Sequence, residues 1–166
     1  MKKILFAASE AVPFMKTGGL ADVTGSLPKY FDKKNYDVRV ILPKYVCMEE
    51  RWKGQLHFLC HFYVNLSWRK QYVGIFETTY DGITYYLVDN EFYFAGNAPY
   101  NNIYEDVEKF AFFSKAVLEA LPYLDFCPDI IHCHDWQTGL LPVFLRTLYG
   151  DEELSLIHIS EPTRQA

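Results

Sequence analysis

The sequence contains few cysteines and no motif that would pair them. Its 166 residues include four, Cys47, Cys60, Cys127 and Cys133, and no two of them share a CxxC spacing. No secretory signal precedes them, and chains without such a signal fold where thiols stay reduced. We therefore predict free thiols and a cytoplasmic location, which excludes the disulfide scaffolds of small secreted proteins.

Long hydrophobic runs are also absent. The apolar stretch at the amino terminus, residues 4–8, is far shorter than the roughly 20 residues that a membrane-spanning helix needs. It is also too short for the core of a signal peptide. A buried first strand explains this stretch better, and we expect no membrane partner.

Positive charge is in the minority. The chain has 16 Lys and Arg against 21 Asp and Glu, a formal net charge of -5. Proteins that bind nucleic acid present a basic surface to the phosphates, so nucleic acid is not an expected partner. Half of the residues are hydrophobic and 22% are charged, the composition of a globular chain. The length suffices for one domain with its own core.

The two common phosphate-binding loops are missing, but a glycine pair is present. Residues 16–23 (KTGGLADV) match neither GxGxxG nor the Walker pattern. Gly18 and Gly19 would let an anion approach the backbone, the amino end of a following helix would add partial positive charge, and Lys16 a full charge. Alternatively, the glycines form an ordinary turn and Lys16 is a solvated side chain.

Strand and helix patterns alternate along most of the chain, which predicts an α/β fold with a mainly parallel sheet. Buried strands are predicted at residues 3–9, 37–43 and 128–135, with helices after residue 19, at 107–121 and at 140–149. Between them, residues 57–66, 71–79 and 83–88 have strand patterns. Asp81-Gly82 between two of these runs predicts a hairpin, and hence an antiparallel insertion. Residues 44–56 and 90–102 are predicted to be irregular.

The first helical segment carries a proline. Its apolar residues at helical spacing are Leu20, Val23, Leu27 and Phe31. Pro28 interrupts the segment, so either the helix kinks there or Ser26 caps a second helix with Pro28 in its first turn. Asp22 lies one turn into the segment, where the helix dipole favours a carboxylate whether or not it has a functional role.

A second polar cluster ends the third buried strand. On a strand, His132 and His134 point to one face and Cys133 to the other. A metal site with Asp135 as a further ligand is one interpretation, but no other cluster completes a ligand shell, so we expect no metal. We favour one histidine as a buried hydrogen-bonding residue and the other as a residue facing a ligand. Asp135 either contacts a ligand or caps the next helix.

Together these residues resemble bacterial glycogen synthase and plant starch synthase, the glucosyltransferases that use ADP-glucose. The likeness covers roughly residues 1–150, and its most specific parts are residues 16–23 and the HCHDW run at 132–136. Ligands of open parallel sheets bind outside the carboxyl ends of the strands, where both runs are expected. Further matching segments are residues 9–10, 40–43, 99–100, 109–110 and 138–140.

The resemblance implies a fold and a reaction. The fold is GT-B, which has two Rossmann-like domains, and this chain would be the amino-terminal, acceptor-side one, a three-layer domain. The reaction transfers glucose from ADP-glucose to the non-reducing end of an α-1,4-glucan such as glycogen, with retention of anomeric configuration. ADP-glucose and the glucan are therefore the expected partners, with no cofactor and no metal.

The resemblance also implies roles for individual residues. Asp22 and His134 lie at the transferred glucose and are the expected catalytic residues. The expected substrate-binding residues are Lys16, Gly18 and Gly19 at the nucleotide-sugar phosphates, Tyr100 near the acceptor glucan, and Asp135.

The end of the chain departs from the family pattern. Residues 156–164 resemble translated sequencing-adapter sequence, so we predict a truncated domain over residues 1–153 and a non-native tail over 154–166. The carboxy-terminal domain, which holds most donor-binding residues in the family, is missing. We therefore expect the fragment alone to be inactive.

Three other functions stay open on the sequence alone. The chain could be a stand-alone glucan-binding module, or part of another GT-B enzyme of the sucrose or trehalose synthase type. The third is a metal-dependent hydrolase built on His132, His134 and Asp135.

Overall fold

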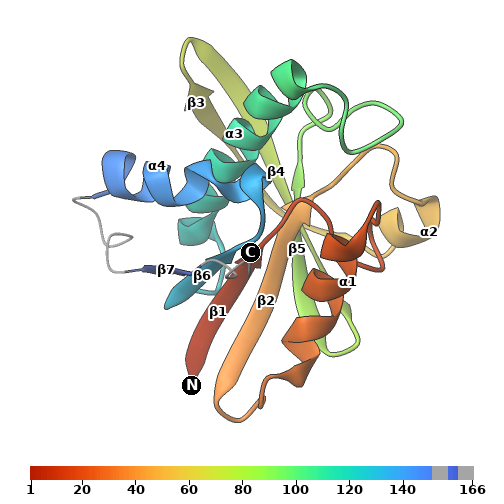
Figure 1. Cartoon of the computed structure of the whole chain (residues 1–166), viewed down its shortest axis with the longest axis vertical. Coiled ribbons are helices and arrows are strands. Elements are labelled where there is room, and N and C mark those ends of the chain that lie inside the picture. The colour runs from red at the N-terminus through yellow and green to blue at the C-terminus, as the bar shows by residue number, and fades with distance from the viewer. Residues whose placement is uncertain (151–156, 161–166) are drawn as a thin grey trace, which may run out of the picture.

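The computed structural model describes residues 1–150 and 157–160. The strands of this part form one seven-stranded sheet in the order β3-β4-β5-β2-β1-β6-β7 (Figure 1). They are β1 Lys2–Ala7, β2 Tyr36–Pro43, β3 His57–Leu66, β4 Arg69–Tyr80, β5 Ile83–Asp89, β6 Ile130–Cys133 and β7 His158–Ser160. The pairs β5–β2, β2–β1, β1–β6 and β6–β7 are parallel, whereas the pairs β3–β4 and β4–β5 are antiparallel. The predicted α/β class and antiparallel insertion are confirmed.

Helices cover both faces of this sheet. They are α1 Gly19–Ser26, α2 Glu50–Lys53, α3 Ile103–Ala120 and α4 Leu140–Leu148, with 3-10 helices at Leu27–Tyr30, Leu121–Tyr123 and Trp136–Thr138. The crossovers β1–α1–β2 and β5–α3–β6 run in opposite directions along the sheet. Because such crossovers are right-handed, α1 and α3 lie on opposite faces. Two separate buried clusters, one on each face, confirm the three-layer arrangement.

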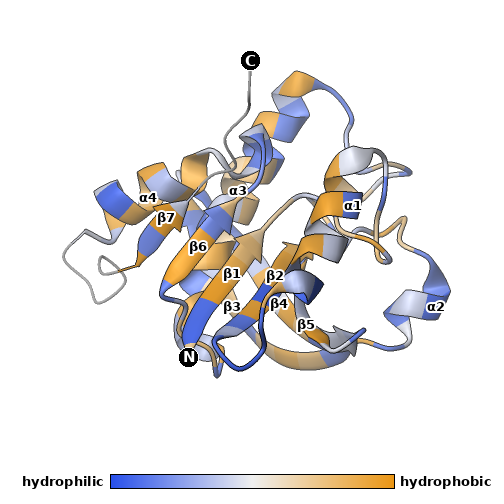
Figure 2. Cartoon of the chain, turned by 60° about the horizontal axis from the view of Figure 1, so that its bottom comes forward, coloured by the Kyte–Doolittle hydropathy of each residue, from blue (hydrophilic) through white to orange (hydrophobic). Residues whose placement is uncertain are grey.

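Strand β1 shows why the first apolar run is continuous. Leu5 and Ala7 are buried in the cluster beneath α3 and α4, and Ile4 and Phe6 in the cluster on the other face. A strand covered on both faces loses the alternation of apolar and polar residues. Figure 2 shows the resulting apolar character of the central strands.

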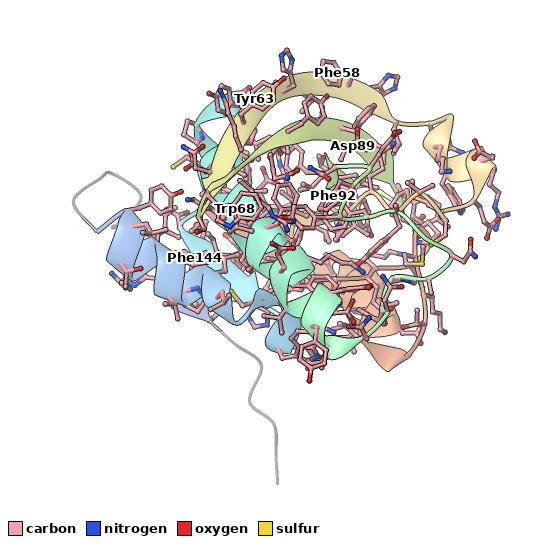
Figure 3. All side chains as sticks on the ribbon, turned by 90° about the horizontal axis from the view of Figure 1, so that it is seen from above. Phe58, Tyr63, Trp68, Asp89, Phe92 and Phe144 are labelled. Carbon is pink, nitrogen blue, oxygen red and sulfur yellow. The ribbon has the colours of Figure 1, made fainter. Side chains whose placement is uncertain are left out.

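The hairpin between β4 and β5 turns at Asp81-Gly82. Both residues have positive φ, 52° and 75°, as the tight turns of hairpins require. Strand β5 then pairs in parallel with β2, which joins the insertion to the main sheet. On β3, at the edge of the sheet, Phe58 and Tyr63 project outward and are 52% and 55% exposed (Figure 3).

The side of helix α1 that is buried is not the side that carries its predicted apolar stripe. Val23 and Leu27 are exposed, and the buried residues are Ala21, Thr24 and Gly25. A Cβ on Gly25 would lie 2.3 Å from Val12 Cγ2 and 2.6 Å from the Val12 carbonyl oxygen. The helix therefore packs through its smallest residues because the backbone after β1 lies against it.

Pro28 neither kinks α1 nor begins a capped second α-helix. The helix ends at Ser26 and continues into the 3-10 helix Leu27–Tyr30, which holds Pro28 in its first turn. The Ser26 side chain makes no capping hydrogen bond. Proline is tolerated at the start of a helical turn because its missing N–H has no partner there.

Three segments differ from their predictions. Residues 44–56, predicted irregular, contain the short helix α2. The third buried strand is only Ile130–Cys133, because the backbone turns sharply at Asp135. Strand β7, in the segment that the sequence excludes from the domain, pairs in parallel with β6. The non-native origin of residues 154–166 stays a prediction, and most of them lie outside the described residues.

The sequence predicts neither a membrane-spanning helix nor a disulfide, and both statements can be compared with the part of the chain that the structure describes. None of its helices combines the length and the apolar character needed to cross a membrane. No disulfide joins Cys47, Cys60, Cys127 and Cys133.

Candidate functional site

The two polar clusters lie at the same edge of the sheet. Strands β1 and β6 are parallel neighbours, with Ala7 opposite Cys133, and the His134 N–H donates to the Ala7 carbonyl at 3.0 Å. The segments that follow the two strands therefore leave the sheet side by side at its carboxyl edge. This is the edge at which open parallel sheets bind their ligands.

Packing within the described chain does not explain why residues 18 and 19 are glycines. Gly18 has an extended backbone, φ -160°, and precedes α1 without a side-chain cap. A Cβ built on Gly18 or Gly19 would meet nothing within 4 Å. The space beside the two glycines, where other residues carry a side chain, is thus open to an incoming group, in contrast to the tightly packed Gly25.

Lys16 and Asp22 form an ion pair beside this turn. Lys16 Nζ lies 2.8 Å from one carboxylate oxygen of Asp22 and 2.9 Å from the other, and both side chains are about half exposed, at 54% and 52%. An exposed pair of this kind contributes at most about 1 kcal/mol. A phosphate at the turn could therefore draw Lys16 away from Asp22 at small cost.

Buried polar residues after β1 hold the turn and connect it to Tyr100. Glu10 Oε2 accepts hydrogen bonds from the Thr17 backbone N–H (3.0 Å) and from Thr17 Oγ1 (2.6 Å). Ser9 Oγ and the Tyr100 hydroxyl are 2.7 Å apart, and Tyr45 donates its hydroxyl proton to the Ser9 carbonyl at 2.6 Å. Burial raises the pKa of Tyr100 to about 12, so its phenol is protonated at neutral pH.

The start of α3 fixes the loop that carries Tyr100. Lys109 Nζ, almost fully buried, donates to the Pro99 carbonyl at 2.8 Å and to Asp106 at 3.2 Å. The Asp106 carboxylate in turn accepts the Asn101 N–H. A buried charge pair with these additional hydrogen bonds holds its neighbours in one arrangement.

Aromatic rings continue from Tyr100 to the second cluster. The ring of Tyr100 lies 5.9 Å from that of Phe110 on α3, which lies 5.6 Å from the ring of Trp136. The predicted acceptor residue and the HCHDW run are thus connected through α3.

His134 is a buried, neutral imidazole. It is 2% exposed, and its ring contacts those of Phe6 at 5.0 Å and His132 at 4.5 Å. Burial, with a smaller effect of neighbouring His132 and against an opposing effect of Asp135, lowers the pKa of His134 to about 4. Within the described residues its Nε2 has no hydrogen-bond partner. An unpaired buried nitrogen costs about 1–3 kcal/mol, and a ligand that bonds to it would recover that cost.

His132 differs from His134 in having a partner. Its Nδ1 lies 2.5 Å from Ser160 Oγ on β7. His132 is thus the hydrogen-bonded histidine of the pair, and that His134 faces a ligand stays a prediction.

Asp135 has a strained backbone. Its φ and ψ are 62° and -179°, a combination that essentially only glycine adopts without cost. It precedes the 3-10 helix Trp136–Thr138, but its side chain makes no capping hydrogen bond. Thr138 Oγ1 instead donates toward the carbonyls of His134 (3.0 Å) and Asp135 (3.1 Å). The backbone is thus held in this conformation from the next turn.

A metal centre is not formed by the described residues. They contain no group of three or more His, Cys, Asp or Glu placed to hold a metal ion. The arrangement around His132, His134 and Asp135 therefore gives no support to the metal-dependent hydrolase.

Sequence reasoning placed Lys16 with the glycine pair, and His134 with Asp135, after two strands at the carboxyl edge of the sheet, and the strands β1 and β6 that precede them are neighbours. Asp22 pairs with Lys16, and Tyr100 bonds to Ser9 just beyond β1. The functional roles of these residues stay predictions.

Sequence reasoning assigned no role to Glu10, Thr17 or the buried Lys109. For Glu10 a signal existed, since it directly follows the first buried strand. Nothing in the local sequence indicates that its carboxylate bonds back to Thr17.

The chain matches the family model described as "Starch synthase catalytic domain" over residues 3–159. It is similar to "Glycogen synthase" of Lachnoclostridium phytofermentans, with 67% identity over 153 residues, 92% of this chain and 32% of the relative. It is also similar to "Glycogen synthase" of Lachnospira eligens, with 61% identity and the same coverage. The chain therefore spans about a third of the length of these curated relatives.

A solved structure is similar as well. It is the "Catalytic domain of Starch Synthase IV from Arabidopsis thaliana bound to ADP and acarbose". The TM-score is 0.83 with 29% sequence identity, over 96% of this chain and 33% of that one.

Proposed function

This chain belongs to the starch synthase catalytic domain family, and from that premise we propose that it is the acceptor-side part of a retaining glucosyltransferase. The whole protein transfers glucose from ADP-glucose to the non-reducing 4-hydroxyl of an α-1,4-glucan. Relatives that carry the name glycogen synthase and a similar structure that holds ADP and acarbose support the donor and acceptor classes.

The observation that carries the proposal is that His134 and the segment leading to residues 16–19 follow two adjoining strand ends, at the same edge of the sheet. On one side an uncapped helix start, an open glycine pair and a lysine suit an anionic diphosphate. On the other side a buried neutral imidazole with an unused nitrogen suits a sugar hydroxyl. A nucleotide sugar has these two parts next to each other.

Each residue at the donor end has a proposed role. Gly18 and Gly19 let the backbone approach the diphosphate, and Lys16 exchanges Asp22 for a phosphate oxygen. Asp22, released from this pair, accepts hydrogen bonds from hydroxyls of the transferred glucose. Positive charge and helix N–H groups aimed at the leaving diphosphate stabilise the charge that develops there. We propose no resident cofactor or metal.

The remaining residues act at the sugars. His134 Nε2 bonds a hydroxyl of the transferred glucose and holds it at the edge of β1 and β6. Tyr100, protonated and fixed by the start of α3, lies along the path of the acceptor glucan. Asp135 contributes to the same wall of the cleft as a substrate-binding residue. A cytoplasmic location fits free thiols and an ADP-glucose donor, and it stays a prediction.

A chimera tests the function directly. Residues 1–150 of this chain are joined to the following part of the 67% identical Lachnoclostridium phytofermentans relative, which supplies the length missing here. We expect radiolabelled glucose from ADP-glucose to enter glycogen, and phosphorylase to release it again as an α-1,4-linked residue. UDP-glucose is the matched competing donor.

The controls separate this chain's contribution from that of the relative. His134→Ala in the chimera is expected to lower kcat/KM by at least 100-fold, and His57→Ala at an exposed position to leave it unchanged. A folded chimera that transfers no glucose from ADP-glucose would contradict the proposed function, whereas its preference between ADP-glucose and UDP-glucose also reports on the part taken from the relative. Products with inverted configuration would contradict the retaining mechanism.

A further inference from the structure

Glu10 is a buried carboxylate to which the proposed reaction assigns no role. It lies just beyond the end of β1 and is 2% exposed. No Lys, Arg or His forms a salt bridge with it in the described residues, and nearby Lys16 pairs with Asp22 instead. Burying a carboxylate without a cation is costly unless hydrogen bonds compensate. The bonds that Glu10 makes are therefore informative about its purpose.

Glu10 holds the glycine pair from both sides. Its carboxylate accepts both hydrogen bonds that Thr17 can donate, from the backbone N–H and from Oγ1, directly before Gly18. Its backbone carbonyl accepts the Thr24 hydroxyl at 2.6 Å, from α1 directly behind the pair. Because Gly18 and Gly19 are conformationally permissive, two fixed flanks are needed to give them one geometry.

Glu10 also reaches the acceptor side. The Tyr100 hydroxyl bonds to Ser9, the residue directly before Glu10, and the charge of Glu10 adds to the effect of burial that raises the pKa of Tyr100. Tyr45 fixes the Ser9 carbonyl from a further loop. The same carboxylate thus lies between the turn proposed for the diphosphate and the tyrosine proposed for the glucan.

We propose that Glu10 is a positioning residue that couples the donor turn to the acceptor tyrosine. Through Thr17 its carboxylate presents the Gly18–Gly19 backbone to the diphosphate, and the adjacent Ser9 carries the hydrogen bond to Tyr100. Binding of nucleotide sugar and binding of glucan are then linked, because the donor turn and the acceptor tyrosine are held by two consecutive residues. The inference rests on the proposed function for the identity of the two ligands.

The test uses the chimera described above with paired variants. Glu10→Gln keeps an oxygen for Thr17 and loses the charge. Thr17→Val removes the hydroxyl and keeps the N–H, and Thr17→Ser restores a hydroxyl. Glu91→Gln makes the same change as Glu10→Gln at an exposed position.

We expect Glu10→Gln and Thr17→Val to raise the KM for ADP-glucose and the KM for glucan about tenfold each. Thr17→Ser and Glu91→Gln are expected to stay within twofold of the unsubstituted chimera. The Tyr100→Phe change should add little to Glu10→Gln in a double-mutant cycle, because each breaks one link of the chain that runs from Tyr100 through Ser9 and Glu10 to Thr17. A change in the KM for ADP-glucose alone, or fully additive effects, would overturn the coupling.

Amide hydrogen exchange in the 166-residue chain tests the structural part without any activity. Thr17→Val and Glu10→Gln should speed exchange at residues 17–21 at least tenfold, while exchange in β1 and β2 stays unchanged. Unchanged exchange at residues 17–21 would refute the positioning role even if the chimera is active. If the unsubstituted chimera is inactive but exchange responds as expected, the proposed function fails and the positioning role of Glu10 stands.

Discussion

At the scale of single residues, burial determines the chemistry of the candidate site. His134 combines near-complete burial with an unpaired Nε2 in the described chain. In solution a histidine titrates near pH 6.5, but here the pKa falls to about 4 because the charged form is poorly solvated. His134 therefore acts as a neutral hydrogen-bonding group and not as a cation.

This shift predicts how stability depends on pH. The unfolded chain takes up a proton at His134 below pH 6.5, whereas the folded chain does so only near pH 4. The free energy of unfolding should therefore fall between pH 6.5 and 4 and level off below. The contribution of His134 is about 3 kcal/mol. Urea unfolding at several pH values measures it.

Substitution isolates the histidine from the carboxylates that titrate in the same range. His134→Gln should flatten the pH dependence between pH 6.5 and 4, and His57→Gln at an exposed position should not. Identical pH profiles for the unsubstituted chain and His134→Gln would show that the buried imidazole is not the cause.

Asp135 is the other residue whose local geometry makes a prediction. Its φ of 62° with ψ near 180° costs about 1–3 kcal/mol for any residue other than glycine. Asp135→Gly should raise the free energy of unfolding by about 1 kcal/mol, because relief of strain exceeds the added entropy of the unfolded chain. The same change should lower kcat in the chimera, since the freed backbone no longer holds His134. Thermal unfolding measures the change in stability, and steady-state kinetics measure the change in kcat.

Asp135→Asn separates the side chain from the backbone. It removes the charge but keeps a Cβ, so the strain and the stability should remain close to those of Asp135. If Asp135→Gly were less stable than Asp135→Asn, the strain argument would be wrong.

At the scale of elements, helix α1 shows that the spacing of apolar residues predicts a helix but does not predict which of its sides packs against the sheet. Its apolar stripe predicts a helix correctly, yet Val23 and Leu27 are exposed and Gly25 is buried against Val12. The three glycines of this segment therefore have two different reasons to be present. Gly25 gives room to the chain itself, whereas Gly18 and Gly19 leave room for another molecule.

The difference predicts opposite results for the same substitution. Gly25→Ala should destabilise the chain by about 1–3 kcal/mol, because the new methyl group would overlap the Val12 backbone. Gly19→Ala, at the first position of α1, should leave stability unchanged or raise it by up to about 1 kcal/mol. In the chimera Gly19→Ala should still raise the KM for ADP-glucose. Loss of stability in Gly19→Ala would mean that this glycine also serves packing.

At the scale of the whole molecule, the sheet order brings the site together. Residues 16–19 and His134 are more than a hundred positions apart in sequence, and the segments that carry them follow β1 and β6, which are neighbours in the sheet. They form one wall of the proposed cleft, and the chain spans about a third of its curated relatives. An active site between two domains needs both walls to exclude water and hold the donor.

The 166-residue chain alone should therefore transfer no measurable glucose from ADP-glucose to glycogen. It should bind maltooligosaccharides weakly, with a Kd of about 1 mM or higher, because one wall buries little of the ligand. Radiolabel incorporation and isothermal titration measure the two quantities. Transfer by the purified chain, or micromolar glucan binding, would instead favour a self-sufficient enzyme or a glucan-binding module.

The sequence by itself determined the class of fold and predicted where the candidate site lies. Periodicity and turn chemistry predicted β1, β2, the hairpin at Asp81-Gly82 and the helices α3 and α4, because these depend on local backbone preference and on one buried face. The motif at residues 16–23 and the HCHDW run were sufficient to indicate the family. The functional roles of the candidate site residues stay predictions until the variants are measured. These residues are Lys16, Gly18, Gly19, Asp22, Tyr100, His134 and Asp135.

Only the tertiary structure decided how these residues are held. The Glu10 bonds to Thr17 and Thr24, the contact of Gly25 with Val12, and the strain at Asp135 all depend on groups that packing brings together. Such contacts cannot be predicted from the local sequence, because a glutamate, a glycine or an aspartate has the same local backbone preferences whichever groups the fold packs against it. The low pKa of His134 likewise requires knowing that helices and strands cover it, because desolvation is a property of the whole fold.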